Sequence, residues 1–258
     1  MNNTFNIQRF GLLLKRQWLE FGKIYLITLA VALGVIVTFY SFALTSIITE
    51  ENPFSPRVLQ FREPLFMVFG FLFITVIASS YFAHLGQKPK AIIDLMIPAS
   101  TFEKFLTGVM FTAIMSTLSF FLIFYLTDLA FIAQVKDISL KYGEPATYFF
   151  AKNKPKEFES IFVIIPVFIT SIFLAGSIYF NKFHYIKTAI SVMIFSGLWA
   201  FIIFKTGEVL FKGRVHVEQV EMNNAPKGWI ELGVFAVFLL LTAIFWIITY
   251  VRLKEKQV

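Results

Sequence analysis

The sequence contains no cysteine and few charged residues. Only 15% of its 258 residues are Asp, Glu, Lys or Arg, where soluble domains have roughly 25%. The absence of cysteine excludes disulfides, thiolate metal sites, iron–sulfur clusters and cysteine nucleophiles. The low charge accompanies 57% hydrophobic residues and a mean hydropathy of +0.73. Most of the chain therefore needs lipid rather than water around it.

The motifs of nucleotide, metal and hydrolase sites are also missing. No GxxxxGK[ST] or GxGxxG pattern occurs, so no nucleotide site is expected on this chain. His84, His184 and His216 lie in three different loops without the spacing of a zinc site. No GxSxG elbow is present, and no histidine lies in an apolar segment to act as a base. We therefore expect no catalytic residue, no metal, no bound cofactor and no enzyme activity of the chain itself.

What the sequence does contain is six long apolar segments. A transmembrane helix needs ~20 mainly apolar residues to cover ~30 Å of hydrocarbon at ~1.5 Å per residue. The segments run approximately over residues 24–47, 65–83, 107–133, 161–180, 186–204 and 229–251. The loops between them are too short to form a soluble domain. We predict an all-α polytopic membrane protein with six transmembrane helices, in which residues 1–258 form a single transmembrane domain.

The leader before the first span has a helical pattern of its own. Its apolar residues recur at spacings of three and four: Ile7, Phe10, Leu14, Trp18 and Phe21. They share one face of a helix and leave the charged residues outside it. The pattern predicts an amphipathic interfacial helix over residues 1–23, lying apolar side down in the membrane surface. The alternative is that these residues are the frayed start of the first span. Because residues 1–23 lack a signal cleavage site, the first span is expected to remain as an uncleaved anchor.

Six spans place both ends of the chain on one side of the membrane. Lys and Arg divide almost evenly between the two sides, but short loops weigh most in the positive-inside rule. The shortest loop, residues 181–187, carries Lys182 and Lys187 and no acid. We therefore expect cytoplasmic termini. The net charge of +7 is scattered among the loops, which favours anionic lipid of the bilayer rather than nucleic acid as its partner.

Acidic residues inside the predicted spans are scarce. Asp128 lies late in the third span and Glu231 early in the sixth, so both are expected near the outer head groups rather than in a substrate site. Ion-coupled transporters need ionisable groups near the middle of the membrane. Their scarcity here counts against a secondary transporter.

The loop between the second and third spans carries the most specific pattern. Residues 91–97 are mostly apolar around the single Asp94, enough for about two helical turns at the membrane surface. Pro98 ends that helix. Ser100 and Glu103 then form an S-x-x-E capping box, which starts a new helix. This order predicts a rigid elbow facing the cytoplasm, suited to docking into a groove on a soluble partner.

The segment LMIPASTFEKFLTG, residues 95–108, resembles the cytoplasmic segment of ABC-2-type transporter permeases. In that family an apolar pair, a proline, a small or hydroxyl residue and an acidic residue precede the third span. The amphipathic leader, the six spans, the cytoplasmic termini and the absence of an ATPase domain agree with the family. The motif itself covers about a dozen residues, whereas the architectural agreement covers most of the chain.

The resemblance implies the transmembrane subunit of an ATP-driven ABC exporter in a bacterial inner membrane. Two permease subunits, identical or homologous, would pair, and two copies of a separate ABC ATPase would bind ATP and Mg²⁺. The leader would be the family's connecting helix, and residues 91–97 its coupling helix, pressed into the ATPase groove. The implied coupling-loop residues are Lys88, Lys90, Ile92, Ile93, Asp94, Leu95, Met96, Pro98, Ser100, Glu103 and Lys104. Of these, the charged residues Lys88, Lys90, Asp94, Glu103 and Lys104 would line the rim.

The family also implies a substrate pathway along the second and fifth spans. Its aromatic contacts would be Phe66, Phe69, Phe73 and Phe195, each of which has a lipid-facing position as the alternative. Two features differ from the family pattern: residues 86–89 lack an acidic run, and the outer loop 206–228 is largely charged. That loop includes the sequence RVHVEQVE, residues 214–221, in which apolar and polar residues alternate. The alternation predicts a strand or a surface helix. These departures concern the substrate class more than the architecture.

Two other functions fit the same sequence. A membrane scaffold or regulatory subunit would bind a soluble partner through the same loop and move nothing. A secondary transporter would follow an ion gradient without an ATPase. An intramembrane enzyme is a more distant alternative, because no base lies within a span.

Overall fold

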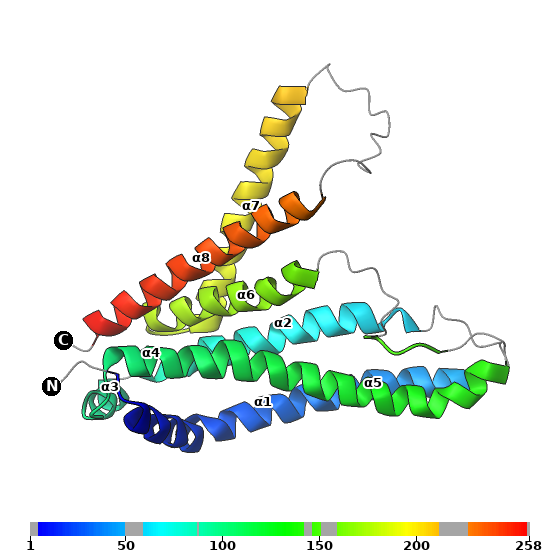
Figure 1. Ribbon diagram of the computed structural model, residues 1–258, viewed down its shortest axis with the longest axis horizontal. Helices are drawn as coiled ribbons and strands as arrows, with labels where there is room; N and C mark the ends of the chain where they lie inside the picture. Colours follow the sequence, from blue (N-terminus) through cyan, green and yellow to red (C-terminus); the bar gives the residue numbers. More distant parts are fainter. Residues whose placement is uncertain are drawn as a thin grey trace.

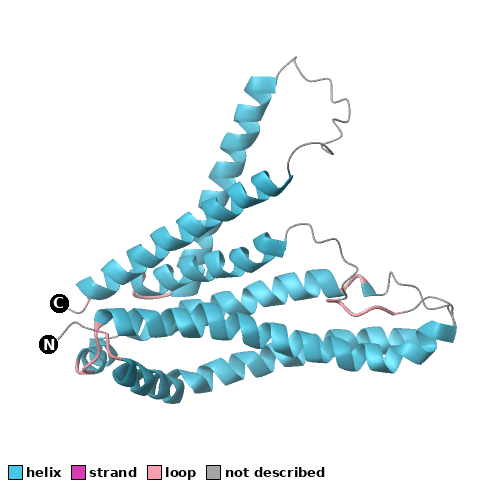
Figure 2. Ribbon diagram, viewed as in Figure 1, coloured by secondary structure: helices cyan, strands magenta, loops and turns pink. Residues whose placement is uncertain are grey.

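The computed structural model describes residues 5–49, 59–86, 88–141, 146–150, 159–211 and 227–256. This part of the chain consists of helices joined by loops, with no strand (Figure 2), which agrees with the predicted all-α class. Residues 214–221, for which the sequence allows a strand or a surface helix, lie outside the described residues. In chain order the elements are α1 (Ile7–Thr49), α2 (Arg62–Tyr81), the 3-10 helix η2 (Ala83–Gly86), α3 (Lys88–Leu95), α4 (Thr101–Val109), the π-helical η3 (Met110–Met115), α5 (Ser116–Lys141), α6 (Glu159–Tyr179), α7 (His184–Phe211) and α8 (Lys227–Glu255).

Five helices in the described part of the chain are long and apolar enough to cross a membrane. They are α1, α2, the continuous α4–η3–α5 rod, α7 and α8. Helix α6 adds a shorter apolar stretch, Ile164–Tyr179. Each predicted span overlaps one of these helices. Their length and composition make the chain an integral membrane protein.

The helices form a bundle with one arm that leaves it. Helices α1, α2 and α5 run side by side, α6 packs on α2, and α8 packs on α6, while α7 rises away from the others (Figure 1). Both ends of the chain lie at the same end of the bundle, together with α3 and the start of α4 (Figure 1). We call it the terminal end. The turn between α6 and α7 lies there too.

The helices differ in how much of their surface the bundle covers. In the most apolar window of α2, 44% of the residues are buried, but in that of α7 only 6%. The exposed residues of α7 are largely apolar, including Leu198, Trp199 and Phe201. A surface of this size and character is stable against lipid and not against water. The exposed arm therefore fits a bilayer environment.

Helix α1 joins the predicted leader and first span in one helix of 43 residues, which bends after its dark-blue N-terminal part (Figure 1). The predicted apolar face of the leader has mixed surroundings. Phe21 is buried against Tyr81, with ring centroids 5.3 Å apart, whereas Ile7 is exposed. Leu12 and Leu19 are also exposed. The leader therefore packs on the bundle through part of the face that the sequence assigns to the membrane, because tertiary packing competes with lipid for the same residues.

A buried ion pair joins α2 and α5 at the end opposite the termini. The Arg62 Nη1 and Asp128 Oδ1 atoms are 2.9 Å apart, and both side chains are almost fully buried. Asp128 also accepts hydrogen bonds from the Tyr40 hydroxyl at 3.0 Å and the Phe149 backbone N–H at 2.8 Å. Arg62 Nη1 donates to the Thr147 carbonyl at 3.1 Å. A charge pair is tolerated in such surroundings when its hydrogen-bonding groups are satisfied in this way.

The position of Asp128 refines the sequence interpretation. Asp128 lies in the middle of α5 (Ser116–Lys141), and its side chain is buried against Arg62 rather than exposed among head groups. Its oxygens bind groups of the chain itself. The side chain of Glu231 lies outside the described residues.

Replacing Asp128 by Ala should destabilise the protein by ~3–5 kcal/mol, because Arg62 is left buried without its partner. Unfolding of the detergent-solubilised protein, followed by circular dichroism, measures the loss. The double variant Asp128→Ala with Arg62→Met should recover part of it, since no unpaired charge remains. The control Asp137→Ala removes an exposed carboxylate from the same helix. Equal stability of Asp128→Ala and Asp137→Ala would contradict the role of the pair.

Candidate functional site

The candidate site is the elbow, residues 88–104, which comprises α3, the turn after it and the first residues of α4. Backbone hydrogen bonds from Met96 N to Ile92 O and from Ile97 N to Asp94 O, each 3.2 Å, close the end of α3. A further bond from Ala99 N to Ile97 O, 2.8 Å, shapes the turn around Pro98. The predicted short helix before Pro98 is therefore present, but it runs over Lys88–Leu95 rather than residues 91–97.

The predicted capping box starts α4. The Ser100 Oγ accepts from the Glu103 backbone N–H at 3.2 Å, and the Glu103 Oε2 accepts from the Ser100 backbone N–H at 2.8 Å. Two backbone N–H groups at the helix start are thereby satisfied. The box fixes the direction in which α4 leaves the elbow.

The same carboxylate binds the start of α1. Glu103 Oε1 accepts from the Asn6 backbone N–H at 2.9 Å and from Arg9 Nη2 at 3.0 Å. Asn6 in turn caps α1, since its Oδ1 accepts from the Gln8 backbone N–H at 2.9 Å. One fully buried carboxylate thus joins the first turns of α1 and α4. We call this arrangement the Glu103 clasp.

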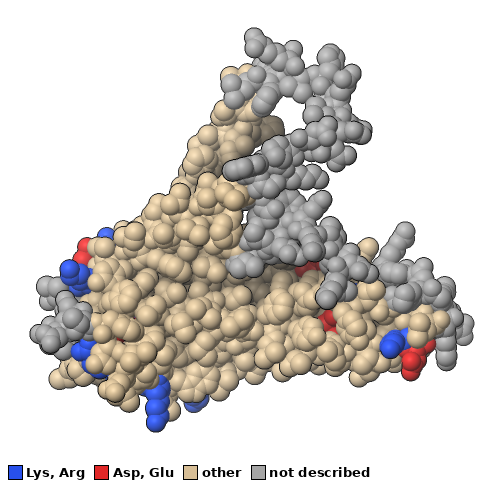
Figure 3. Space-filling model, in the orientation of Figure 1, with Lys and Arg blue, Asp and Glu red and all other residues tan. Residues whose placement is uncertain are grey.

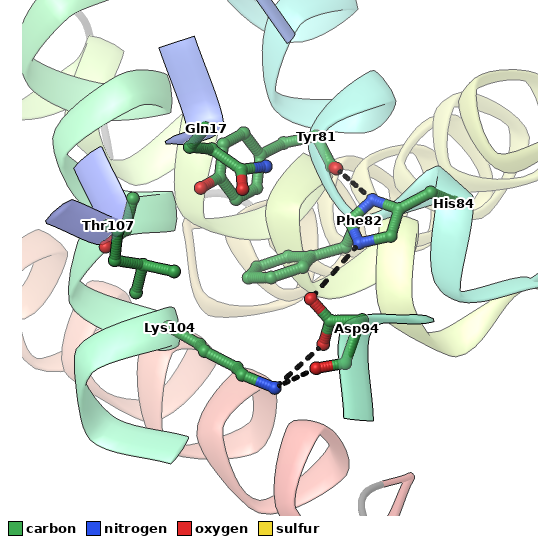
Figure 4. A pocket seen from close by; sticks show the side chains of 8 residues that line it. Gln17, Tyr81, Phe82, His84, Asp94, Lys104 and Thr107 are labelled. Carbon is green, nitrogen blue, oxygen red and sulfur yellow. Dashed lines mark hydrogen bonds and ion pairs between the residues drawn. The ribbon is translucent and has the colours of Figure 1, made fainter. Parts of the chain in front are cut away.

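A second polar cluster ties α3 to its neighbours. The Lys104 Nζ donates to the Asp94 backbone oxygen at 2.6 Å and to Asp94 Oδ2 at 3.1 Å. His84 Nε2 lies 4.0 Å from Asp94 Oδ1, and His84 Nδ1 lies 3.0 Å from the Tyr81 carbonyl oxygen. Figure 4 shows Asp94 between Lys104 and His84 at the edge of a small pocket also lined by Gln17 and by other residues of α1, α2 and α4. The orientation of α3 is therefore fixed from α4 and from η2, which follows the end of α2.

These two clusters correct the prediction of rim charges. Glu103 and Lys104 are buried and Asp94 is largely buried, so none of the three is free to line the edge of a partner's groove. They turn inward because each has a partner in the chain that satisfies its charge. The side chains of Lys88, Lys90 and Leu95 lie outside the described residues.

Among the side chains of the elbow that the structure describes, the exposed ones are apolar. Ile92, Ile93 and Met96 are 57%, 56% and 79% exposed, and they lie outside the helices long enough to cross a membrane. We call these three side chains the α3 face. A group of large apolar side chains exposed on a rigid polar base is typical of a protein interaction site.

Of the four predicted pathway residues, Phe66, Phe69 and Phe73 lie on α2 and Phe195 lies on α7. Phe73 is buried between Tyr25 and Phe120, with ring centroids 6.1 and 5.9 Å away. Phe66 lies in a cluster of aromatic rings from α5 and the segment after it, and Phe69 lies beside Phe39, 5.8 Å away. Phe195 is exposed on α7. Within this chain Phe66 and Phe73 serve packing of the bundle.

Two long-range ion pairs of the structure are not marked by any local sequence motif. Arg9 lies 94 residues from Glu103 in the chain, and nothing local marks the pair. Arg62 and Asp128 are 66 residues apart, but they occupy the same end of adjacent antiparallel spans with opposite charges. That juxtaposition is the signal from which the second pair could have been found.

Comparisons of this chain with protein-family models, with curated proteins and with solved structures find no match.

Replacing Glu103 by Ala should release the start of α1, because Arg9 and the Asn6 N–H lose their acceptor. Charge-assisted hydrogen bonds contribute ~1.5–3 kcal/mol each, so local opening should increase at least about tenfold. The rate of tryptic cleavage after Arg9, Lys15 or Arg16 in the solubilised protein measures it. The control Glu20→Ala breaks the exposed Arg16–Glu20 pair and should leave the rate nearly unchanged. Unaltered cleavage of Glu103→Ala would rule out the clasp.

Proposed function

We propose that this chain is the transmembrane permease subunit of an ATP-driven exporter of the ABC-2 type. Its termini and elbow face the cytoplasm of a bacterial cell, two permease subunits pair, and two copies of a separate ATPase bind and hydrolyse ATP. The observation that carries the proposal is the α3 face, an exposed apolar surface on a buried polar frame beside the bundle. The resemblance of residues 95–108 to the family supports the same assignment.

We propose that α6 is the sixth transmembrane helix. Helix α6 has 21 residues, and at ~1.5 Å per residue a helix of that length covers the ~30 Å of the hydrocarbon core. With α6 as a span, an even number of crossings returns the chain to its starting side. The position of both termini at one end of the bundle supports that count (Figure 1).

The elbow is built to transmit movement. Lys104 ties α3 to α4, and His84 of η2 ties α3 to the end of α2 through its contact with the Tyr81 carbonyl. Through the Glu103 clasp α4 is tied to α1. A partner that grips the α3 face and changes its own conformation on ATP binding would therefore displace three helices together. Conformational changes of this kind usually open and close a pathway by moving packed helices as rigid bodies.

A membrane scaffold or regulatory subunit is the second candidate. The packing of Phe66 and Phe73 inside the bundle favours it, because two of the proposed pathway residues are occupied within the chain. A scaffold would bind the ATPase through the α3 face and leave its rate of ATP hydrolysis unchanged. The exporter subunit would change that rate in the assembled complex.

The double substitution Ile93→Asp with Met96→Asp should weaken binding of the proposed partner ATPase, to be sought in the adjacent reading frames, by at least about a hundredfold. Burial of each large apolar side chain contributes ~1.5–3 kcal/mol, and a buried carboxylate adds a penalty. Copurification and ATP turnover of the complex measure it. The matched control Ile93→Leu with Met96→Leu keeps the apolar surface and should assemble normally. Normal assembly of the Asp variant would argue against docking at this face.

The absence of native cysteine allows a direct test of orientation. A membrane-impermeant maleimide should label Met96→Cys in inside-out vesicles and not in intact cells. Tyr148→Cys, at an exposed residue beyond α5, should show the reverse, because it lies at the opposite end of the bundle. Labelling of both variants from one side, or of Met96→Cys from outside the cell, would contradict the proposed topology.

A further inference from the structure

A cluster of cations and aromatic rings lies at the terminal end, where the α6–α7 turn meets the end of α8. We call it the basic turn: Tyr179, Phe180, Lys182, Phe183, Lys187, Arg252 and Lys256. The Lys256 Nζ lies 3.4 Å from Asn181 Oδ1, which joins the end of α8 to the turn. His184, at the start of α7, interacts electrostatically with both Lys256 and Lys187, which places the two cations around the start of α7.

Aromatic rings position two of the cations. The Arg252 Cζ is 5.2 Å from the centroid of the Tyr179 ring, and the Lys187 Nζ is 5.7 Å from that of Phe180. Both distances are within the range of cation–π contact. Tyr179 is itself exposed. Two cations are thus held on rings at an accessible surface rather than in carboxylate pairs with other helices.

The basic turn carries positive charge that the described residues do not neutralise. Elsewhere at this end three cations have carboxylate partners: Arg9 with Glu103, Arg16 with Glu20 and Lys104 with Asp94. In the basic turn Arg252 pairs with Glu255 at 2.7 Å, while Lys182, Lys187 and Lys256 have no carboxylate partner among the residues described. Lys and Arg gather at this end on the face seen in Figure 3.

The surroundings of Lys256 also favour a bound anion. Burial lowers the pKa of the Lys256 ammonium, and the charge of Arg252 lowers it further. Both effects oppose the charged form of the side chain. A phosphate placed between these two groups would relieve the repulsion and supply hydrogen-bond acceptors to both.

Apolar side chains adjoin these cations. Phe183 has a φ of 54°, the one non-glycine residue with positive φ in the described part of the chain, and it is 70% exposed. This backbone conformation is costly for a bulky residue. The turn nevertheless adopts it, and the Phe183 ring is exposed. Ile186 beside it is also exposed. The surface therefore combines an anion site with a place for a hydrocarbon chain.

We propose that the basic turn binds an anionic phospholipid of the leaflet on the terminal side. Its phosphate lies among Lys187, Arg252 and Lys256, and its acyl chains lie along Phe183 and Ile186. The adjoining apolar residues select a lipid over a soluble phosphate, which would gain nothing from them. Because a Cβ at Gly86 would lie 2.7 Å from the Asn181 carbonyl oxygen, the turn packs directly against η2, which leads into the elbow. Lipid bound here braces the base of the elbow.

Native mass spectrometry of the purified full-length protein tests this inference without any ATPase. The protein in mild detergent is titrated with phosphatidylglycerol and, separately, with phosphatidylcholine, and the apparent Kd of the first bound lipid is measured. Wild type should prefer phosphatidylglycerol. The variant Lys187→Gln with Lys256→Gln should lose at least about fivefold in affinity for it, the effect expected of even one cation at a membrane surface. Lys187→Arg with Lys256→Arg should retain it.

The matched control is Lys15→Gln with Lys23→Gln, which removes the same charge from α1 at residues that also lack a described carboxylate partner. Its affinity for phosphatidylglycerol should equal that of wild type, and circular dichroism establishes that both Gln variants remain folded. Equal affinity of wild type and the Lys187/Lys256 Gln variant, or an equal loss in the control, would overturn the proposal. Displacement of the lipid by millimolar inorganic phosphate would also overturn it, because the site would then take a soluble anion.

Discussion

The arrangement of the elbow depends on the hydrogen bonds and the ion pair that the buried Glu103 carboxylate makes. A carboxylate removed from water is costly unless its oxygens find donors. Here the donors are the backbone N–H groups of Ser100 and Asn6 and the guanidinium of Arg9. Because these groups belong to the starts of α4 and α1, satisfying one charge brings two helix ends together. Helix α3 follows in a fixed orientation, held by Lys104, and its apolar residues are left on the outside.

The bundle thus has a polar cluster at each end and apolar packing between them. Lipid supplies little hydrophobic force between helices, so close packing and hydrogen bonds must hold spans together. Close packing is visible where α6 meets α7: a Cβ at Gly176 would lie 2.0 Å from Thr188 Oγ1. At Gly70 a Cβ would lie 2.9 Å from the ring of Phe120. Glycine at these positions lets the helices approach, and the Arg62–Asp128 pair fixes the opposite end.

Much of the fold follows from local sequence patterns. Long apolar segments locate the spans because helix length must match the thickness of the hydrocarbon core. Ser100 and Glu103 locate the start of α4 because a capping box is a short-range motif. The long-range contacts leave no such pattern. The partners Arg9 and Glu103 are 94 residues apart, and a single sequence does not distinguish a charge that faces a partner protein from one that folds back into the chain. For that reason the sequence pattern alone assigns Glu103 and Lys104 to the rim, whereas the structure buries both side chains and exposes the apolar α3 face.

The central claim is that the α3 face docks into a separate ATPase. Incorporating a photo-crosslinking amino acid at Ile93 in living cells, followed by identification of the adduct, tests that claim most directly. The account predicts a covalent adduct with a cytoplasmic protein that contains a phosphate-binding loop. Adducts with lipid alone, or with proteins outside the cytoplasm, would contradict it.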